Sequence, residues 1–432
     1  MVALNQTKPL QYDIAVIGGG AAGLMAAGTA ARRGLRVCLI EKKDRLGRKI
    51  LITGKGRCNL TNYCDEQTVI ASVPTNGRFL YSAIHQFTPR DTIDFFEGMG
   101  LPTKVERGNR VFPQSDKASD VADRLSAFAR HGGADTLTGE VKNLLLRDAA
   151  VYGVELRDGT QIFASSVIVC CGGASYPGTG STGDGYRFAR QAGHTVTPLR
   201  PSLVPLTVDG SECSEMMGLS LKNVALRVFD TEKKKQIYED FGEMLFTHFG
   251  LSGPIVLSAS AHMRDMAPGR YQVSIDLKPA LSPEQLDLRL QRDFAQNLNR
   301  DFSNSLGALL PRKMIPVLIQ RSEIAPETKC NQITKEQRRA FAELLKSFTL
   351  TVSGFRPIEE AIVTSGGVKV SEISPKTMES KLVAGLYFAG EVLDVDAYTG
   401  GFNLQIAFST GKLAAESLPL PAGDVPPTIT ID

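Results

Sequence analysis

Near the amino terminus, short continuous runs of apolar residues alternate with a segment of small residues. Residues Asp13–Ile17 and Arg36–Ile40 predict two buried strands, and Ala21–Arg33 predicts a helix between them that ends at Gly34. Continuous apolar strands are typical of a parallel sheet that is covered on both faces. The segment therefore predicts a β-α-β unit.

A different pattern follows in the middle of the chain. Val141–Arg147, Val151–Arg157 and Gln161–Phe163 alternate in polarity and predict a small antiparallel meander. A separate buried strand is predicted at Ser166–Cys171, and a carboxyl-terminal helix at Leu404–Glu416.

The β-α-β rhythm stops near residue 198, where three prolines occur close together, and it returns near residue 353. We therefore predict an α/β protein with a discontinuous Rossmann-like domain and an inserted domain. The insert contains strand-like segments and then helical patterns. The predicted boundaries are 1–197 and 353–432 for the Rossmann-like domain, 198–280 and 348–352 for a β-barrel-like part of the insert, and 281–347 for its helical subdomain.

Composition narrows the class of protein. The chain has 432 residues, of which 42% are hydrophobic and 22% charged, with a net charge of +3. These values fit an ordinary soluble protein and give no reason to expect a nucleic-acid or membrane partner. The seven cysteines and five histidines lack metal-ligand spacing, so no metal is expected. We expect a cytoplasmic protein that acts on a small molecule.

The turn after the first strand carries a nucleotide-binding pattern. Gly18, Gly20 and Gly23 fit G-x-G-x-x-G between a strand and a helix. In this pattern the first glycine makes the turn, the second admits a pyrophosphate and the third lets the helix pack closely. Glu41, at the end of the second strand, is placed to accept hydrogen bonds from ribose hydroxyls and disfavours a 2′-phosphate. A dinucleotide with a free ribose is therefore predicted here.

Two further segments favour FAD over NAD as that dinucleotide. A polar, glycine-rich loop occupies 47–59, where Arg48 and Lys49 can balance a pyrophosphate. Near the carboxyl terminus, a strand runs into Gly390 and Glu391, a pattern typical of flavoproteins that hold the ribityl chain with this turn.

On these motifs the chain resembles the YhiN/BaiN-type family of FAD-binding oxidoreductases, also called aminoacetone-oxidase-like. One departure is Lys55, which stands where the family loop usually has glycine. The matching segments span almost the whole chain and are Ile17–Gly23, Thr53–Asn62, Gly172–Gly185, Phe246–Pro254, Thr364–Val368, Gly390–Asp394 and Gly400–Gln405.

The resemblance implies a fold of the two-dinucleotide-binding type, non-covalent FAD and a set of cofactor contacts. Adenosine would be bound by Ala22, Glu41, Lys42 and the backbone of Val141; the pyrophosphate and ribityl chain by Arg48, Lys49, Gly54 and Glu391; and the flavin ring by Thr53, Asn59, Asn403 and Leu404. Gly172 opens a further glycine-rich turn of the same site. From the residues alone, Val141 is equally well explained as a core residue.

Three residues are candidates for substrate chemistry, each with a structural alternative. His248 can donate a proton or bind a carbonyl, or be bonded into a domain junction. Arg57 can bind an anionic substrate or the flavin edge, or form a salt bridge. Tyr398 can cap the flavin ring or pack.

We therefore expect hydride transfer between flavin N5 and a small organic substrate or NAD(P)H. The family suggests reduction of an activated C=C bond or oxidation of a small amine or alcohol. NADH or NADPH would be a transient electron donor, because the sequence has no convincing second dinucleotide fingerprint. Two alternatives stay open: a flavoprotein of the tRNA-modifying type and a non-catalytic FAD-binding module.

Overall fold

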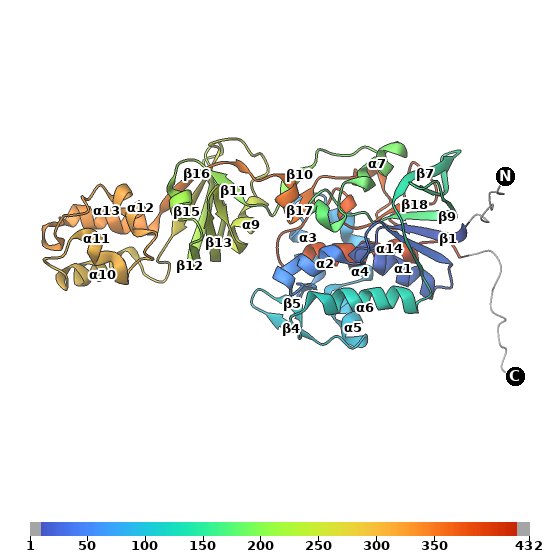
Figure 1. Cartoon of the computed structure of the whole chain (residues 1–432), viewed down its shortest axis with the longest axis horizontal. Coiled ribbons are helices and arrows are strands. Elements are labelled where there is room, and N and C mark those ends of the chain that lie inside the picture. The colour runs from blue at the N-terminus through green and yellow to red at the C-terminus, as the bar shows by residue number, and fades with distance from the viewer. Residues whose placement is uncertain (1–9, 421–432) are drawn as a thin grey trace, which may run out of the picture. The chain divides into compact units, whose positions relative to one another are not determined.

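The computed structural model describes residues 10–420 and divides them into two compact units (Figure 1). The first unit runs to Arg200 and resumes at Val363, and the second is Pro201–Ile362. The ends of the predicted Rossmann-like domain, 1–9 and 421–432, lie outside the described residues.

A seven-stranded sheet forms the centre of the first unit (Figure 1). Strands β6 (Asp135–Thr138), β2 (Val37–Glu41), β1 (Leu10–Ile17) and β9 (Gln161–Val169) lie side by side in this order and run parallel. Strand β18 (Leu386–Phe388) also pairs with β9 in parallel. The buried parts of β1, β2 and β9 show the continuous apolar runs that predict a parallel sheet, whereas the edge strand β6 is polar and largely exposed.

One strand prediction is wrong. Gln161–Phe163 and Ser166–Cys171 are not separate strands, since one unbroken strand, β9, contains the first segment and continues through the second as far as Val169. Its first residues pair antiparallel with β8 (Ala150–Leu156), next to β7 (Val141–Arg147), while the whole strand pairs parallel with β1. The linking residues Ala164 and Ser165 contain neither glycine nor proline, so nothing in the chain forces a turn there.

Helix α1 (Ala21–Arg32) packs against α6 (Ala118–His131) and α14 (Phe402–Glu416). Between residues 10 and 420, no helix is both long enough and apolar enough to cross a membrane. The other α-helices and strands of the first unit that bear on the site are α2 (Arg48–Ile52), β3 (Thr61–Asn62), α3 (Glu66–Ala71), α4 (Tyr81–Gln86), α5 (Pro89–Gly98), β4 (Thr103–Glu106), β5 (Arg110–Pro113), α7 (Asp184–Gln191) and β17 (Val363–Ser365).

The second unit contains the predicted barrel and helical subdomain. The barrel is closed because β11 pairs with both β14 and β16. Its strands are β11 (Leu206–Val208), β14 (Gly250–Ser252), β13 (Lys235–Thr247), β12 (Ser220–Asp230), β15 (Tyr271–Asp276) and β16 (Phe348–Phe355). Helix α9 (Pro254–Ser260) packs on β13, and the helical subdomain between β15 and β16 contains α10 (Pro283–Ala295), α11 (Phe302–Ser305), α12 (Ile315–Ser322) and α13 (Lys335–Lys346).

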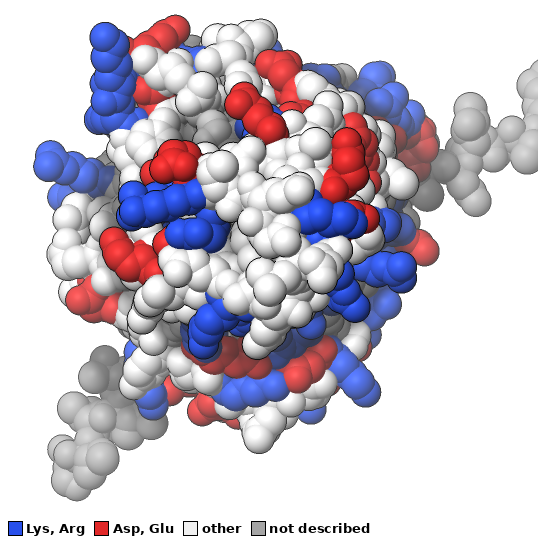
Figure 2. Space-filling model, turned by 90° about the vertical axis from the view of Figure 1, so that its left-hand side faces the viewer, with Lys and Arg blue, Asp and Glu red and all other residues white. Residues whose placement is uncertain are grey.

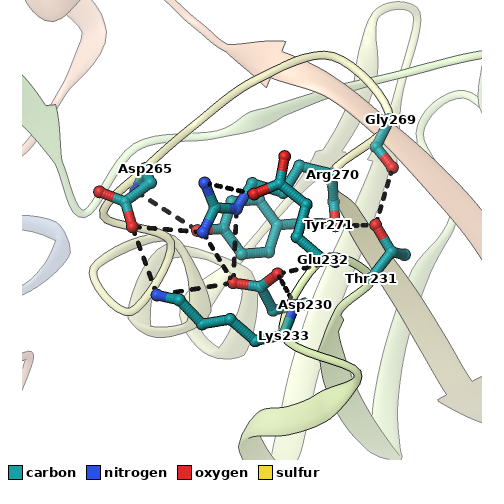
Figure 3. A network of polar contacts seen from close by, with 8 residues as sticks. All are labelled: Asp230, Thr231, Glu232, Lys233, Asp265, Gly269, Arg270 and Tyr271. Carbon is teal, nitrogen blue, oxygen red and sulfur yellow. Dashed lines mark hydrogen bonds and ion pairs between the residues drawn. The ribbon is translucent and has the colours of Figure 1, made fainter.

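The buried carboxylate of Asp230 stabilises the turn between β12 and β13 through hydrogen bonds (Figure 3). Asp230 is 1% exposed and accepts hydrogen bonds from the backbone N–H groups of Glu232 (3.1 Å) and Lys233 (3.0 Å). The Arg270 guanidinium, beside the start of β15, also donates to it at 3.1 Å. Burial raises the pKa of Asp230, but these hydrogen bonds more than offset it, so the pKa lies below its usual range.

We expect Asp230→Ala to lower the midpoint of thermal unfolding by several degrees, because it leaves two backbone N–H groups without their acceptor and removes the one buried carboxylate among the three that pair with Arg270. Circular dichroism measures the midpoint. Glu239→Ala is the matched control, since it breaks an exposed ion pair with Arg227 on the same hairpin. Equal midpoints for the two variants would contradict a stabilising role for Asp230.

Candidate functional site

The three fingerprint glycines have different surroundings. Gly18 has a φ of +102°, and a Cβ there would lie 2.6 Å from the Cys170 carbonyl oxygen. A Cβ at Gly23 would lie 1.9 Å from the Gly18 carbonyl oxygen, whereas one at Gly20 would meet no atom within 4 Å. Gly18 and Gly23 are therefore required by the packing, while Gly20 faces open space that a pyrophosphate can approach.

The N-terminus of α1 can bind an anion. Its N-cap residue is Gly20, no side chain caps it, and its first turn contains no acidic residue. The first N–H groups of a helix have no partner within the helix, and they lie at the positive end of the helix dipole. This end of α1 suits a pyrophosphate.

Glu41 lies beside this turn, as the sequence predicts. One of its carboxylate oxygens accepts a hydrogen bond from the Gly19 N–H (2.7 Å), and the other accepts one from the Lys43 N–H (2.9 Å). An ionised carboxylate has about four lone-pair positions, so two stay available for ribose hydroxyls. The backbone contacts hold the carboxylate in one orientation at the end of β2.

The other proposed adenosine contacts lie at the same edge of the sheet. Lys42 forms an ion pair of 2.5 Å with Asp184. Burial raises the pKa of Asp184, but hydrogen bonds from Lys42 and Thr182 more than offset it and lower the pKa overall. Val141 is buried at the start of β7, just after the β6 residues that pair with β2, and its carbonyl accepts a hydrogen bond from Arg187.

The loop after α2 has an unusual backbone. Gly54, Lys55, Gly56 and Cys58 all have φ between +56° and +85°. Lys55 is exposed but adopts a conformation that favours glycine, which explains why a glycine is usual at this position. Burial raises the pKa of the Cys58 thiol to about 12, so this cysteine is unsuited to redox chemistry.

Asn59 gives the most direct sign of a ligand in this loop. Its side-chain oxygen Oδ1 is buried and has no hydrogen-bond partner among residues 10–420. Buried polar atoms in folded proteins are nearly always paired, so an unpaired one calls for a partner from outside the chain. A donor group of a flavin ring fits this oxygen. Thr53, nearby, donates from its hydroxyl to the Ile50 carbonyl at 2.6 Å.

The carboxyl-terminal turn meets the loop through an ion pair. The Lys49 ammonium lies 2.7 Å from Glu391, and Ser175 contacts both groups. Glu391 also accepts a hydrogen bond from the Thr364 N–H at 2.9 Å. Sequence reasoning named Lys49 and Glu391 but missed Ser175 and Thr364, although both lie in segments that carry the family resemblance.

Helix α14 begins at Phe402, after Gly401, with no side-chain cap and no acidic residue in its first turn. A Cβ at Gly401 would lie 2.4 Å from the Thr61 carbonyl oxygen, so the helix start is held against β3. The Asn403 side chain bonds both backbone groups of Ala397, and Leu404 is partly buried. Asn403 and Leu404 therefore have their backbone N–H groups to offer a flavin.

Gly172 has a φ of +69°, and a Cβ there would lie 2.8 Å from the Ser181 hydroxyl oxygen.

Arg48 forms an exposed ion pair of 2.7 Å with Asp44. A cavity of about 650 Å³ in the first unit lies beside this ion pair, and residues of the loop after β2, of α2 and of the loop after β9 line it. Its lining residues are Asp44, Arg45, Arg48, Leu51, Ile52, Tyr176, Gly178 and Thr179.

Of the three candidates for substrate chemistry, Arg57 is fully occupied. Its guanidinium forms ion pairs with Glu106 and Asp116 and lies over the Phe112 ring at 4.2 Å. Hydrogen bonds to the two carboxylates raise its pKa further, so it cannot release a proton near neutrality. The salt-bridge alternative describes its contacts.

The contacts of His248 and Tyr398 do not distinguish between a catalytic and a structural role. His248 is exposed at the tip of the β13–β14 hairpin, with its ring 5.0 Å from that of Phe249. Tyr398 is half-buried, and its N–H donates to the Ser72 carbonyl. Sequence reasoning missed a second histidine of the barrel unit, His262, whose ring lies 4.7 Å from that of Tyr238. Burial and Arg264 lower the pKa of His262 to about 4.

The glycine turn, the carboxylate at the end of β2 and the unpaired Asn59 oxygen fit one cofactor, and they define an FAD-dependent oxidoreductase of the Rossmann flavoprotein class. The chain belongs to the family described as HI0933-like protein Rossmann domain, whose model matches residues 12–417. This match confirms the family resemblance, the fold class and the FAD cofactor that the sequence predicts.

Similar proteins cover the chain almost end to end. It is 34% identical to the 3-dehydro-bile acid delta(4,6)-reductase of Clostridium scindens, over 94% of this chain and 98% of that protein. It is also 34% identical to the ribosomal RNA dihydrouridine synthase of Escherichia coli, with the same coverage. The solved 3-ketosteroid delta1-dehydrogenase of Sterolibacterium denitrificans is 13% identical, with a TM-score of 0.52 over 94% of this chain and 99% of that chain, which shows a shared fold.

We expect Gly20→Ala to weaken FAD binding about tenfold or more, equivalent to about 1.4 kcal/mol, because the new methyl group projects into the space that the pyrophosphate approaches. The unfolding midpoint of the FAD-free protein should not change, since no atom lies within 4 Å of that methyl group. Isothermal titration with FAD and thermal unfolding measure the two effects.

Two companion variants make this comparison specific. Gly23→Ala should lower both FAD affinity and stability, because its methyl group collides with the Gly18 carbonyl. Gly98→Ala, whose methyl group also meets open space, should leave FAD affinity unchanged and should not lower the stability. Unchanged FAD affinity in Gly20→Ala would show that the cofactor does not approach this turn.

Proposed function

We propose that the protein reduces a carbon–carbon double bond conjugated to a carbonyl group in a small organic molecule. The observation that carries the proposal is the chemistry shared by two relatives of equal similarity. The name of one specifies a reductase of delta(4,6) unsaturation in a 3-dehydro-bile acid, and that of the other specifies the formation of dihydrouridine. In both names a double bond conjugated to a carbonyl becomes saturated.

The site supports this chemistry. Bound FAD supplies hydride transfer at N5. The uncapped N-terminus of α14 offers N–H groups and a positive dipole end that would stabilise negative charge on a reduced flavin. One hydride and one proton add across the double bond, and the two electrons come from NADH or NADPH.

The net charge and the one face drawn in Figure 2 favour a small substrate over RNA. In the view of Figure 2, Lys and Arg side chains are interspersed with Asp and Glu and do not form one broad basic field. The net charge is +3 over 432 residues. Proteins that bind nucleic acid generally present clustered Lys and Arg to the phosphates. Uridine in ribosomal RNA is the second candidate substrate, because a full-length relative carries that name.

We expect NADH or NADPH to bleach the flavin absorbance of the purified protein in the absence of oxygen, and a steroid-like enone to restore it. Mass spectrometry should show that the enone has gained two hydrogens. A ribosomal RNA transcript, analysed for dihydrouridine under the same conditions, is the parallel substrate.

The outcomes separate the candidates. Saturation of the enone without change in the RNA supports the proposal, and dihydrouridine alone supports the RNA candidate. Absence of bleaching by either nicotinamide donor, together with no turnover of either substrate, would leave the non-catalytic FAD-binding module.

We also expect His248→Gln to lower kcat about 100-fold, the size of a typical general-acid contribution. Its ring is exposed, so the substitution should cost little stability. FAD affinity and the unfolding midpoint should stay unchanged. The control is His131→Gln, an exposed histidine on α6. A fall in stability without a specific loss of kcat would assign His248 a structural role.

A further inference from the structure

A chain of three polar side chains, the first two of them buried, lies in the first unit apart from the proposed cofactor contacts and consists of Ser380, His194 and Glu372. The Nε2 atom of His194 lies 2.7 Å from the Ser380 hydroxyl oxygen, and Nδ1 lies 3.1 Å from a carboxylate oxygen of Glu372. The His194 side chain is 0% exposed. The order serine, histidine, carboxylate is that of a hydrolase triad.

The surroundings of Ser380 exclude hydrolysis. Its hydroxyl oxygen accepts hydrogen bonds from the N–H groups of Leu382 (3.0 Å) and Val383 (2.9 Å). A hydroxyl has two acceptor positions and one donor hydrogen, so both lone pairs are used and the hydrogen points to His194 Nε2. No lone pair is left for nucleophilic attack. The same count fixes the tautomer: Nδ1 carries the proton and donates to Glu372.

Two segments that flank Glu391 depend on this arrangement. On one side, Ser380 fixes the turn before β18, and the His194 ring packs edge-on against Phe388 of β18 at 5.1 Å. Strand β18 leads directly into Gly390 and Glu391.

On the other side, the residues after His194 connect to the segment that follows Glu391. Thr197 and Gly367 exchange hydrogen bonds, and Val196 forms a β-bridge with Val368. Val368 in turn forms a bridge with Leu393. His194 therefore lies where both supports of the Gly390–Glu391 turn meet.

We propose that His194 is a positioning residue for FAD: its neutral ring holds the Gly390–Glu391 turn in place, and its protonation weakens FAD binding. A protonated ring must donate from Nε2 to an oxygen whose lone pairs are already taken, and the serine hydrogen loses its acceptor. The turn that Ser380 fixes would then have to move, and β18 with it.

The electrostatic environment of His194 favours the neutral form of its ring. Burial lowers the pKa of His194 more than the hydrogen bond and charge of Glu372 raise it. Other groups on the packed elements have their own partners: Lys381 donates to the Ser371 carbonyl, and Glu379 accepts from the Gly385 N–H. Further titratable side chains on the same segments include Lys369, Lys376, Arg187, Arg190 and Tyr387.

The sign of the pH effect follows from linkage. The form with the ordered turn, in which the His194 pKa is lowered, binds fewer protons than a form in which the turn is released, and FAD is expected to select the ordered turn. FAD affinity is therefore constant above the ordinary histidine pKa of about 6.5 and falls below it, by at most about tenfold per pH unit.

The test measures the FAD dissociation constant by isothermal titration at pH about 7.5 and about 5.5, on either side of the ordinary histidine pKa. Near-ultraviolet circular dichroism checks at each pH that the protein is folded. In the unaltered protein we expect the dissociation constant to rise at the lower pH by up to about tenfold. His194→Gln keeps a neutral acceptor for Ser380, so its dissociation constant should not depend on pH.

Two further variants keep the test decisive. His85→Gln is the matched control, because His85 also lies 3.1 Å from a glutamate but is exposed; it should keep the pH dependence. Ser380→Ala should bind FAD more weakly at neutral pH and lose the pH dependence, because the crowded oxygen is gone. A pH-independent dissociation constant in the unaltered protein, or the same dependence in His194→Gln or Ser380→Ala, would overturn the proposal.

Discussion

The cofactor-binding half of the molecule depends on close backbone contact around one residue, Ala22. A Cβ on Gly411 of α14 would lie 2.4 Å from the Ala22 carbonyl oxygen, and one on Gly390 would lie 2.9 Å from the Ala22 Cβ. One residue along, Gly23 brings α1 against the turn at Gly18. Side chains at these glycines would push α1, α14 and the Gly390 turn apart. The first turn of α1 is therefore held by chain segments from both ends of the sequence.

The same contacts fix the start of α14. Its Gln405 is fully buried, accepts hydrogen bonds from Thr61 and Thr92, and donates to the Phe87 carbonyl. Because this buried amide is bonded on both its oxygen and its nitrogen, it specifies one position for the helix. Helices α1 and α14 pack together, and both begin at a glycine without a side-chain cap. The fold thus presents two helix N-termini, one suited to a pyrophosphate and one to the electron-rich edge of a flavin.

What the sequence could predict was local. The β1-α1-β2 unit with Glu41 at its end, and an insert that is part β and part helical, follow from periodicity and glycine spacing over short segments, and each is present. The contacts of the predicted residues were not accessible in this way. Lys49 meets Glu391 across 342 positions of sequence, and the carboxylates that occupy Arg57 lie 49 and 59 positions away. A motif identifies such residues, but only the folded structure shows which of their charges and lone pairs already interact with other groups of the protein.

Most of the cations predicted to bind the cofactor are already paired with carboxylates. Lys42, Lys49 and Arg57 each lie within an ion pair with a carboxylate of the first unit, and Arg48 pairs with Asp44 at the surface. A cation that is already paired adds little net charge to its surroundings, so these side chains contribute less to binding a pyrophosphate than their number suggests. The larger share falls to backbone N–H groups and the α1 dipole, which are fixed in place by the fold and need no carboxylate to be displaced. The groups that bind the anion are backbone N–H groups, and the glycines allow the backbone segments that carry them to pack closely. Anion binding therefore depends on the same glycines as the packing of α1.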